Sequence, residues 1–483
     1  MFFLPRFIPI EVYALRLLSP ALFVVGMGLM VGSVLYLNPR SPGFPYARSL
    51  ELVTEGTELS PALKETVRGY DSLELTSLYP LEDGSNRLLR RVLIASSGRR
   101  DAELRKALLR VFQLTVAGRV VVLEDSHQRL REEMLAQGRL PVVDRGEVVV
   151  GNGLNKKVGE RVTIGGREFQ VVGMFQPRMR LFHNAMVAYY SSITDVLLEG
   201  EGWERFKSFV FDAPSSGELQ QLASSIQKHL PPEGGFWLFT QDRSLSPGAF
   251  YLYYVGFFLL IIGGVSGMGE TLKWMARRLK PGSLSSAVQV VVDHRREYWL
   301  VNGVYFGLAL IIAFIVYYSP SVQDFTTHLV QQQIQSGEGM LGWAGRAYAS
   351  GVIPYAALVT FVVNSFFGAF LYIVLPSLVI PGIGLLTGIF RSLSWGLLLS
   401  PSTESLASAM IPHSITLLLE GEAYVLCMFF VYLMVRGLVR REGSLGERYR
   451  KGVGLNIRGF LLVLLVLAVA ALYEATEVIL LMR

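Results

Sequence analysis

Three ionisable residues, His413, Glu420 and Glu422, stand close together in an apolar stretch of the C-terminal half. Seven residues make about two helical turns, so His413 and Glu420 share one helix face and Glu422 lies on another. Ionisable groups inside a bilayer are costly and usually face a bundle interior or water, so one interpretation is a proton-linked role or a transport pathway. The other is that His413 caps a helix start at the outer interface while the acids pack against polar groups of neighbouring helices. The position of His413 near the expected helix start favours this second interpretation.

Arg391 is another ionisable residue at an expected membrane depth, near the middle of an apolar run of only about 18 residues. A buried cation needs a partner, and the acids available in this half of the chain are Glu420, Glu422, Glu474 and Glu477. Alternatively, the guanidinium extends to the interface from a kinked helix that does not fully span the membrane. The sequence leaves both interpretations open.

No motif for catalysis or for a cofactor occurs in the chain. There is no Gly-x4-Gly-Lys-Ser/Thr phosphate loop, no His-Glu-x-x-His zinc motif and no Gly-x-Ser-x-Gly nucleophile elbow. The single cysteine, Cys427, lies in an apolar run, which excludes an intrachain disulfide and a cysteine-based metal site. We therefore expect a non-catalytic membrane subunit without cofactor or metal, in which any ATP is hydrolysed by a partner chain.

The elements that hold these residues are membrane helices. Hydrophobic residues make up 51% of the 483 residues and charged residues only 17%, which is unusual for a soluble chain of this length. The block from 352 to 437 is almost unbroken in its apolar character, and one helical crossing needs about 20 apolar residues. The apolar runs of the whole chain predict seven crossings: Val12–Leu37, Phe250–Met268, Trp299–Tyr318, Val352–Leu375, Gly382–Leu399, Ile415–Val435 and Phe460–Leu481.

Basic residues are concentrated in two short segments between apolar runs. Residues 39–248 carry 27 Lys and Arg against 26 Asp and Glu, whereas residues 268–297 have a net charge of +3 and residues 436–458 one of +5. Short Lys/Arg-rich loops stay in the cytoplasm, so we expect the N-terminus inside, the C-terminus outside and a large domain outside. The basic residues do not form one face with interleaved aromatics, so we expect contact with the lipid bilayer but not with nucleic acid.

The segment 40–247 is long enough to form one extracytoplasmic α/β domain between the first two crossings. Alternation from Glu147 to Phe175, with Gly165-Gly166 at its turn, predicts a β-hairpin. Ser215-x-x-Glu218 predicts a capped helix after a strand at Phe209–Phe211. Other expected elements are a strand at Arg91–Ala95, a helix at Asp101–Phe112 and, after the third crossing, a helix at about Phe325–Gln335.

The hairpin region carries Lys156-Lys157-Val158-Gly159, then Gly159-Glu160-Arg161-Val162-Thr163-Ile164, then Gly166-Arg167-Glu168-Phe169-Gln170-Val171-Val172-Gly173. This pattern resembles the periplasmic core domain of macrolide-exporter-type ABC permeases, and Ala188–Ile193 resembles the strand and short helix that follow there. The resemblance covers about residues 10–270. It implies a separate ABC ATPase as partner. The cytoplasmic Arg-Glu-x-Gly segment and the closing helices of that family are absent here.

The second half, roughly residues 285–483, resembles the stage II sporulation protein M family. The residues that carry this resemblance are Asn364, Gly368-Ala369, Ile380-Pro381-Gly382-Ile383-Gly384, Gly396-Leu397-Leu398, Ile411-Pro412-His413 and Ala471-Leu472-Tyr473-Glu474. The family commonly has Pro-His-Gly-x-x-Glu, whereas here Ser414 follows His413 and Leu417 replaces the acid. Arg391 stands where members often carry Asn. A role for the missing acid is therefore not transferred to this chain.

The two resemblances imply a polytopic α-helical protein of the bacterial cytoplasmic (inner) membrane. Its expected parts are residues 1–39 with the first crossing, the α/β core domain 40–247, the second crossing 248–270, a basic cytoplasmic segment 271–297 and a five-helix module 298–483. The candidate intramembrane functional residues are Asn364, Arg391, His413, Glu420, Glu422 and Glu474.

The function implied is that of a permease-like subunit of an ABC-type transporter or mechanotransmission complex. The ATPase is expected to dock on Arg277, Arg278, Lys280, Arg295 and Arg296, or on the loop 437–458. We expect a homodimer or heteromer by analogy with two-fold ABC assemblies. One alternative is a non-transporting scaffold for cell-envelope (peptidoglycan-remodelling) enzymes or other membrane proteins. Another is an ion-coupled transporter that uses His413, Arg391 and the acids.

Overall fold

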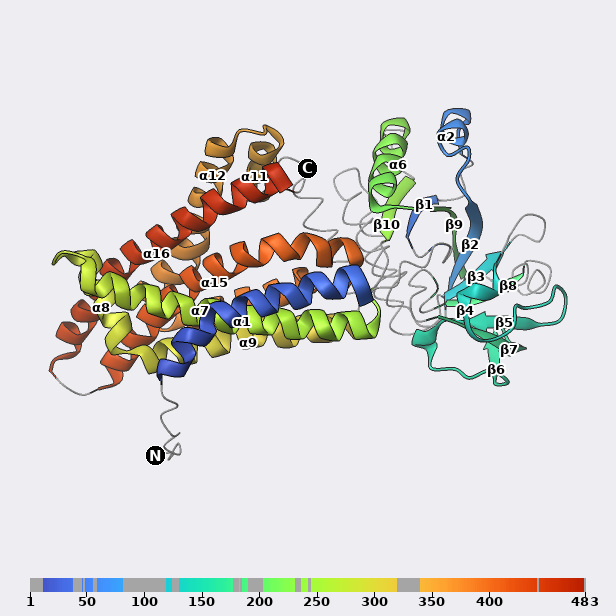
Figure 1. The fold of residues 1–483 in the computed structure, drawn as a ribbon. Helices are drawn as coiled ribbons and strands as arrows, with labels where there is room; N and C mark the ends of the chain where they lie inside the picture. The colour runs from blue at the N-terminus through green and yellow to red at the C-terminus, as the bar shows by residue number, and fades with distance from the viewer. Residues whose placement is uncertain are drawn as a thin grey trace. The chain divides into compact units, whose positions relative to one another are not determined.

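The computed structural model describes residues 12–37, 46, 48–54, 59–80, 119–123, 130–176, 182, 185–189, 203–230, 236–241, 245–318, 339–440 and 443–481. The expected elements at 91–95, 101–112 and 325–335 lie outside these residues. The chain divides into two compact units, which are traced in Figure 1. One comprises Met1–Pro39, Leu245–Ser402 and Leu406–Arg483, and the other comprises Arg40–Ser244 and Thr403–Ser405.

The first unit is a bundle of helices (Figure 1). Six helices among the described residues are long and apolar enough to cross a membrane. They are α1 with η1 (Val12–Gly32, Ser33–Leu37), α7 (Pro247–Arg278), α9 (Arg295–Tyr318), the continuous α12, η6 and α13 (Ile353–Val362, Val363–Val374, Leu375–Val379), α15 (Glu404–Val439) and α16 (Leu445–Leu481). Two shorter helices are α8 (Ser283–Asp293) and α11 (Gly339–Ala349). The architecture is that of a multi-pass helical membrane protein.

The expected fifth crossing is the one that does not form a helix of full membrane length. Its segment folds as α14 (Ile383–Leu398), which has 16 residues. This helix is about 24 Å long and the hydrocarbon core is about 30 Å thick. Other limits differ because the helices continue into polar residues beyond their apolar runs. The second crossing extends to Arg278 and the sixth begins at Glu404.

The course of α15 corrects the expected position of His413. The helix passes through Pro412, so His413 lies about two and a half turns inside it rather than at its start. Proline removes one backbone hydrogen bond, which membrane helices tolerate where neighbouring helices satisfy the freed groups. The helical hydrogen bond that Pro412 cannot donate is the one to the Ser408 carbonyl. The Tyr473 hydroxyl of α16 makes a separate contact, donating to the carbonyl of Pro412 itself at 3.2 Å.

Glycine allows α1 and α7 to pack backbone against backbone (Figure 1). A Cβ added at Gly26 of α1 would lie 2.5 Å from the Gly256 carbonyl of α7, and one at Gly263 would lie 2.6 Å from the Phe23 nitrogen. The Ser19 hydroxyl donates to the Gly263 carbonyl at 2.8 Å. Small residues at such contacts are the usual basis of close helix association in membranes. The two helices that flank the α/β unit in sequence are therefore joined along their length.

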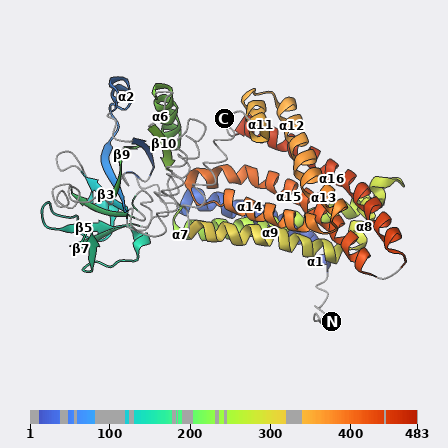
Figure 2. The same ribbon diagram turned by 180° about the vertical axis from the view of Figure 1, so that it is seen from behind.

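The short helix α14 runs parallel to α9, and Figure 2 shows the two lying alongside each other. Ser392 donates to the Tyr305 carbonyl at 2.5 Å, and Ser400, just beyond the end of α14, donates to the Ala313 carbonyl at 2.7 Å. Because the second contact lies eight residues after the first in both segments, the two segments run in the same direction. These two hydrogen bonds fix the position of the 16-residue helix α14 along α9.

Contacts between helix ends define the two ends of the bundle. At one end Arg436 pairs with Glu297, and Arg458 Nη1 lies 3.4 Å from the Ser286 hydroxyl. We call this the basic end, because both basic segments of the sequence reach it. At the other end the Leu245 amide donates to the Ser402 carbonyl at 3.1 Å, and the Tyr317 hydroxyl donates to the Leu245 carbonyl at 3.1 Å. Helix α7, which follows the α/β unit in the sequence, begins at this second end.

The second unit contains one sheet, with strand order β10-β1-β9-β2-β3-β8-β5-β7-β4 and β6 paired to β7. The strands are β1 (Ser49–Thr54), β2 (Ser72–Pro80), β3 (Arg119–Leu123), β4 (Leu135–Gly138), β5 (Glu147–Val150), β6 (Arg161–Ile164), β7 (Arg167–Phe175), β8 (Ala185–Tyr189), β9 (Trp203–Asp212) and β10 (Phe236–Gln241). Helix α2 (Pro61–Thr66) joins β1 to β2, and α6 (Ser216–His229) joins β9 to β10. Each pair of strands joined by a helix is separated by a strand of the other pair, which is the split, ferredoxin-like βαβ arrangement.

Two local predictions in this unit are confirmed. Strands β6 and β7 form an antiparallel hairpin closed between Ile164 and Arg167, and both glycines of the turn have positive φ, +55° and +82°. Positive φ at both central positions is what a two-residue hairpin turn of this type requires. The Ser215 hydroxyl caps α6 by accepting from the Glu218 amide at 3.2 Å.

Candidate functional site

Exposed aromatic residues form a band near each end of the bundle. Trp274 on α7 and Trp299 on α9 lie near the basic end, and Tyr251 and Tyr318 lie near the opposite end of the same two helices. At 1.5 Å per residue the bands are about 35 Å apart along α7 and about 28 Å apart along α9. Trp and Tyr are enriched at the two membrane–water interfaces, and the hydrocarbon core between them is about 30 Å thick. The bands therefore mark the part of the bundle that fits inside a bilayer.

A chain of four polar side chains lies between these bands. Arg391 of α14 donates from Nη2 to the Tyr424 hydroxyl at 2.6 Å, and this hydroxyl donates to Asn364 Oδ1 at 3.1 Å. Asn364 in turn donates from Nδ2 to Glu420 Oε1. The chain thus connects a cation to an anion through two neutral groups rather than by a direct ion pair. Of the four acids considered as partners for Arg391, Glu420 is the one to which this chain leads.

Aromatic rings hold Arg391 inside the bundle. Its guanidinium carbon lies 3.8 Å from the centre of the Tyr424 ring and 5.9 Å from that of Trp395. The face of an aromatic ring attracts a cation, and more strongly where water is excluded. Together with its hydrogen bond to Tyr424, this stacking orients the guanidinium toward α15.

The polar chain lies deep between the two bands. A Cβ added at Gly421 would lie 2.6 Å from the Phe306 ring, so this turn of α15 packs directly on α9. Phe306 is about 10 Å from Trp299 and about 18 Å from Tyr318 along the helix. Glu420, one residue before Gly421, is 8% exposed. This is the region of a bilayer in which an uncompensated charge is most costly.

Glu474 of α16 joins the same group. It lies within reach of side-chain hydrogen bonds to Glu420 and to Tyr348 of α11. Two carboxyl groups can hydrogen-bond to each other only when one of them holds a proton. Arg391, Glu420 and Glu474 therefore form a group of one cation and two acids, which is neutral when one proton is bound.

Asn364, which donates to Glu420, lies in a π-helical segment. The segment η6 has 12 residues, Val363–Val374, and such segments in α-helices are often found at functional sites. Gly368 follows Asn364 within it. A Cβ at Gly368 would lie 2.8 Å from the Tyr424 hydroxyl and 3.3 Å from Arg391 Nη1. Glycine at this position thus leaves the space that the polar chain occupies.

His413 belongs to a second polar group, nearer the end opposite the basic end. Its Nδ1 lies 3.1 Å from Glu477 Oε1, and the Thr416 hydroxyl donates to Glu477 Oε2 at 2.7 Å. The Glu477 side chain is fully buried, whereas that of His413 is 23% exposed. His413 and Glu420 lie on similar faces of α15, as their spacing predicts, but they contact different acids.

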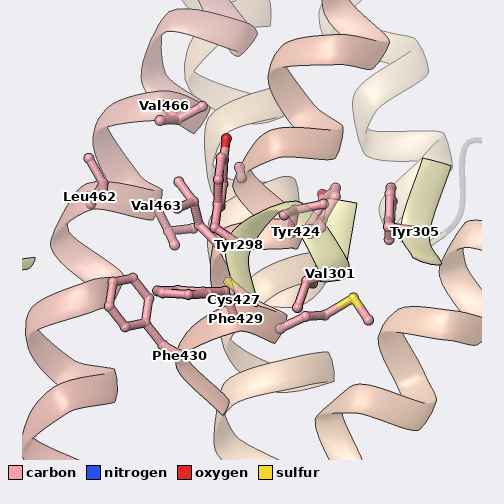
Figure 3. Close-up of a cluster of buried hydrophobic side chains, with 14 of the residues drawn as sticks. Tyr298, Val301, Tyr305, Tyr424, Cys427, Phe429, Phe430, Leu462, Val463 and Val466 are labelled. Atoms are coloured by element: carbon pink, nitrogen blue, oxygen red, sulfur yellow. The ribbon is translucent and has the colours of Figure 1, made fainter. Parts of the chain in front are cut away.

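Glu422 forms a third group and faces α9. The Tyr298 hydroxyl donates to Glu422 Oε2 at 2.5 Å, and Asn302 lies within hydrogen-bonding reach of the same carboxyl group. Tyr298 also packs edge-to-face on Phe429 at 6.1 Å between ring centres (Figure 3). Val463 and Val466 of α16 belong to the same buried apolar cluster as Tyr298 and Phe429 (Figure 3). The carboxyl group is thus enclosed by tyrosine, asparagine and apolar side chains.

The sequence pattern points to Asn364 but not to the other residues that connect these groups, which are Tyr424, Tyr298 and Asn302. Tyr424 follows Glu420 by four residues, a spacing that puts both on one helix face and could have marked it. Tyr298 and Asn302 have the same spacing on α9 and both face Glu422. Neither pair stands out from the sequence alone, because aromatic residues are common throughout the chain.

The five residues expected to dock an ATPase lie together at the basic end and are all exposed. Arg277 and Arg278 end α7, Lys280 lies in the link to α8, and Arg295 and Arg296 begin α9. Three residues of the second basic segment, Arg440, Arg450 and Lys451, are also exposed. Helix α8 packs its buried residues Ala287, Val288 and Val291 into the bundle. The result is a basic surface on a helical platform.

No protein-family model matches this chain, and no curated protein matches it either. Within the described ranges, no group of three or more His, Cys, Asp and Glu residues could hold a metal ion. The candidate site is therefore defined by its own geometry, as three buried polar groups between the aromatic bands and one exposed basic surface.

Proposed function

We propose that this chain is the membrane (permease-like) subunit of an ABC-type transporter or mechanotransmission complex. A separate ATPase binds the basic end in the cytoplasm, and its motion passes through the bundle to the α/β unit outside. The N-terminus is inside, and the membrane is the cytoplasmic membrane of a bacterium. This proposal agrees with the resemblance of the first half to exporter-type permeases and of the second half to stage II sporulation protein M.

The observation that carries the proposal is the course of α7. This helix has 32 residues and is about 48 Å long, which is more than the roughly 30 Å needed to cross the hydrocarbon core. It begins where the chain leaves the α/β unit and ends with Arg277 and Arg278 at the basic end. A force applied at the basic end would reach the α/β unit along one continuous helix, and the close contact with α1 would move both flanking helices together.

The charge distribution supports the proposed orientation. Short loops rich in Lys and Arg remain in the cytoplasm, and both such segments meet at the basic end. The parallel course of α14 and α9 adds a further argument. If α9 leads outward from the basic end, α14 does so too, and α15 returns inward to Arg436. Although α14 is short, it then completes the alternation that seven crossings require.

The proposal is tested by native purification with identification of the co-purifying proteins. The wild-type chain should bring down a nucleotide-binding subunit. A triple charge reversal, Arg277→Glu with Arg278→Glu and Lys280→Glu, should reduce its recovery at least tenfold without affecting membrane insertion. Lys228→Glu, at an exposed position of α6 in the α/β unit, is the matched control and should change nothing.

Absence of a nucleotide-binding subunit from the wild-type preparation would contradict the proposal. Recovery of cell-envelope enzymes in its place would favour the scaffold instead. Equal recovery of the ATPase with the triple variant would place the docking surface elsewhere, for example on the segment around Arg450.

A further inference from the structure

The carboxyl group of Glu422 has an incomplete set of hydrogen bonds. Its Oε2 accepts from Tyr298, but its Oε1 is buried without a hydrogen-bond partner among the described residues. Asn302 has the same defect, because its Oδ1 is also buried without a partner there. Both oxygens accept hydrogen bonds and neither can donate one when Glu422 is ionised. Buried polar atoms without partners are rare and need an explanation.

Reversal of the Asn302 amide does not remove this defect. In the present orientation Nδ2 donates to the Tyr298 carbonyl at 3.1 Å. Turning the amide over would point Oδ1 at this carbonyl, which can only accept, so one mismatch would be exchanged for another. The orientation of Asn302 is therefore set by its own helix, and the missing donor must come from Glu422.

No cation compensates Glu422 within the described part of the chain. Its partners on α9 are Tyr298 and Asn302. The apolar cluster around Tyr298 includes Val463 and Val466 of α16 (Figure 3). On α15 itself, Glu420 lies on another face and contacts Asn364. Two basic residues of the bundle have other partners: Arg391 contacts Tyr424, and Arg436 pairs with Glu297 at the basic end. An ionised, fully buried carboxylate at this depth would cost several kcal/mol.

We infer that Glu422 is a proton-binding site, in which the carboxyl group holds a proton on Oε1 and donates it to Asn302 Oδ1. This single proton satisfies both orphaned oxygens and leaves Tyr298 as the donor to Oε2. On protonation the carboxylate takes one proton from water and its charge goes from −1 to 0, with no other bond changed. Because the site is closed by α9 against α15, separation of these helices would admit water and release the proton. Proton binding is thereby linked to the closed arrangement of the two helices, whether or not an ATPase acts on the bundle.

The test is the pH dependence of thermal unfolding of the full-length protein in lipid nanodiscs. A proton held in the folded state stabilises the protein at low pH, and this stabilisation is lost as rising pH removes it. Wild-type protein should therefore lose thermal stability from neutral to alkaline pH. Glu422→Gln keeps the shape and supplies a permanent donor, so it should match the wild type at neutral pH and lose most of the alkaline fall. Glu447→Gln, at an exposed site near the basic end, is the control and should behave as wild type.

Three results would overturn the inference. In the first, Glu422→Gln unfolds at a lower temperature than the wild type at neutral pH. In the second, Glu422→Gln loses as much thermal stability at alkaline pH as the wild type does. In the third, the wild type is more stable in sodium chloride than in choline chloride at the same pH. The last would assign the site to a metal cation. An independent readout is infrared spectroscopy of the wild type and of Tyr298→Phe. A buried protonated carboxyl band should be present and should shift in Tyr298→Phe, and its absence would reject the proposal whatever the variants do.

Discussion

Glu420 and Glu422 are two residues apart on the same helix, and both are buried in the bundle, yet their surroundings differ in kind. Glu420 is connected through Asn364 and Tyr424 to Arg391, and it has a second acid, Glu474, beside it. Glu422 meets a tyrosine and an asparagine but no cation among the described residues. One carboxyl group is balanced by a cation and the other by a proton.

Helix geometry explains this difference. Two residues turn an α-helix by about 200°, so neighbouring acids in the pattern Glu-x-Glu face different helices. Glu420 faces η6, where π-helical geometry and Gly368 make room for the polar chain. Glu422 faces the buried side of α9, near its basic end. Identical side chains thus acquire different chemistry from the helices they face.

Removal of Arg391 should lower the free energy of unfolding more than any other substitution at these two acids or their partners. Arg391→Met keeps most of the side-chain volume but leaves Glu420 without its cation. Breaking a buried charge pair by removing one partner typically costs about 3–5 kcal/mol. We expect a loss of this size in the free energy of unfolding, measured by denaturant titration in detergent micelles. Arg277→Met, at an exposed position, is the control, and equal losses in the two variants would mean that Arg391 compensates no buried charge.

Loss of a tyrosine hydroxyl should have a smaller effect at either acid. Tyr424→Phe breaks the link from Arg391 to Asn364, and Tyr298→Phe removes the donor to Glu422 Oε2. Leaving a buried group without its partner costs about 1–3 kcal/mol. We expect Tyr424→Phe to be the more destabilising, because its hydroxyl both accepts and donates in the chain. A larger loss for Tyr298→Phe than for Tyr424→Phe in the same titration would show that the hydrogen bond to Glu422 contributes more to stability than the polar chain from Arg391 to Glu420 does.

An ion pair in the α/β unit should show the smallest loss of stability and provides a reference for the others. In the α/β unit, Arg139 makes two hydrogen bonds to Glu147, at 2.6 and 2.7 Å, and these lower the pKa of Glu147. Arg139 is half exposed, and in Arg139→Met the Glu147 carboxylate keeps the hydrogen bond from the Val142 amide at 2.9 Å. The loss of stability should therefore be smaller than for Arg391→Met. Because the pKa of Glu147 is lowered in the folded state, the contribution of the pair is present at neutral pH and disappears as acid protonates Glu147. If Arg139→Met lowers the free energy of unfolding by the same amount in acid as at neutral pH, the loss comes from packing and not from charge.

Apolar runs made the membrane helices predictable, and glycine and proline made some local features predictable, such as the Gly165-Gly166 hairpin. What could not be predicted was the rotation of each helix about its axis, which decides that Glu477 meets His413 while Glu422 meets Tyr298. Helix ends were also misjudged where polar residues continue a helix beyond its apolar run, as at Glu404, or where a proline lies within one, as at Pro412. The partners of buried acids depend on contacts between distant segments, and single-sequence spacing contains no such information.

The assignment of different partners to the two acids is tested most directly by combining Arg391→Met with Glu420→Gln in one variant and with Glu422→Gln in another. Neighbouring groups that interact show coupling energies of about 0.5–3 kcal/mol in such double-mutant cycles. Glu420→Gln should restore part of the stability lost in Arg391→Met, because it removes the carboxylate left without a cation, and Glu422→Gln should restore none. Rescue by Glu422→Gln, or no rescue by Glu420→Gln, would contradict the account.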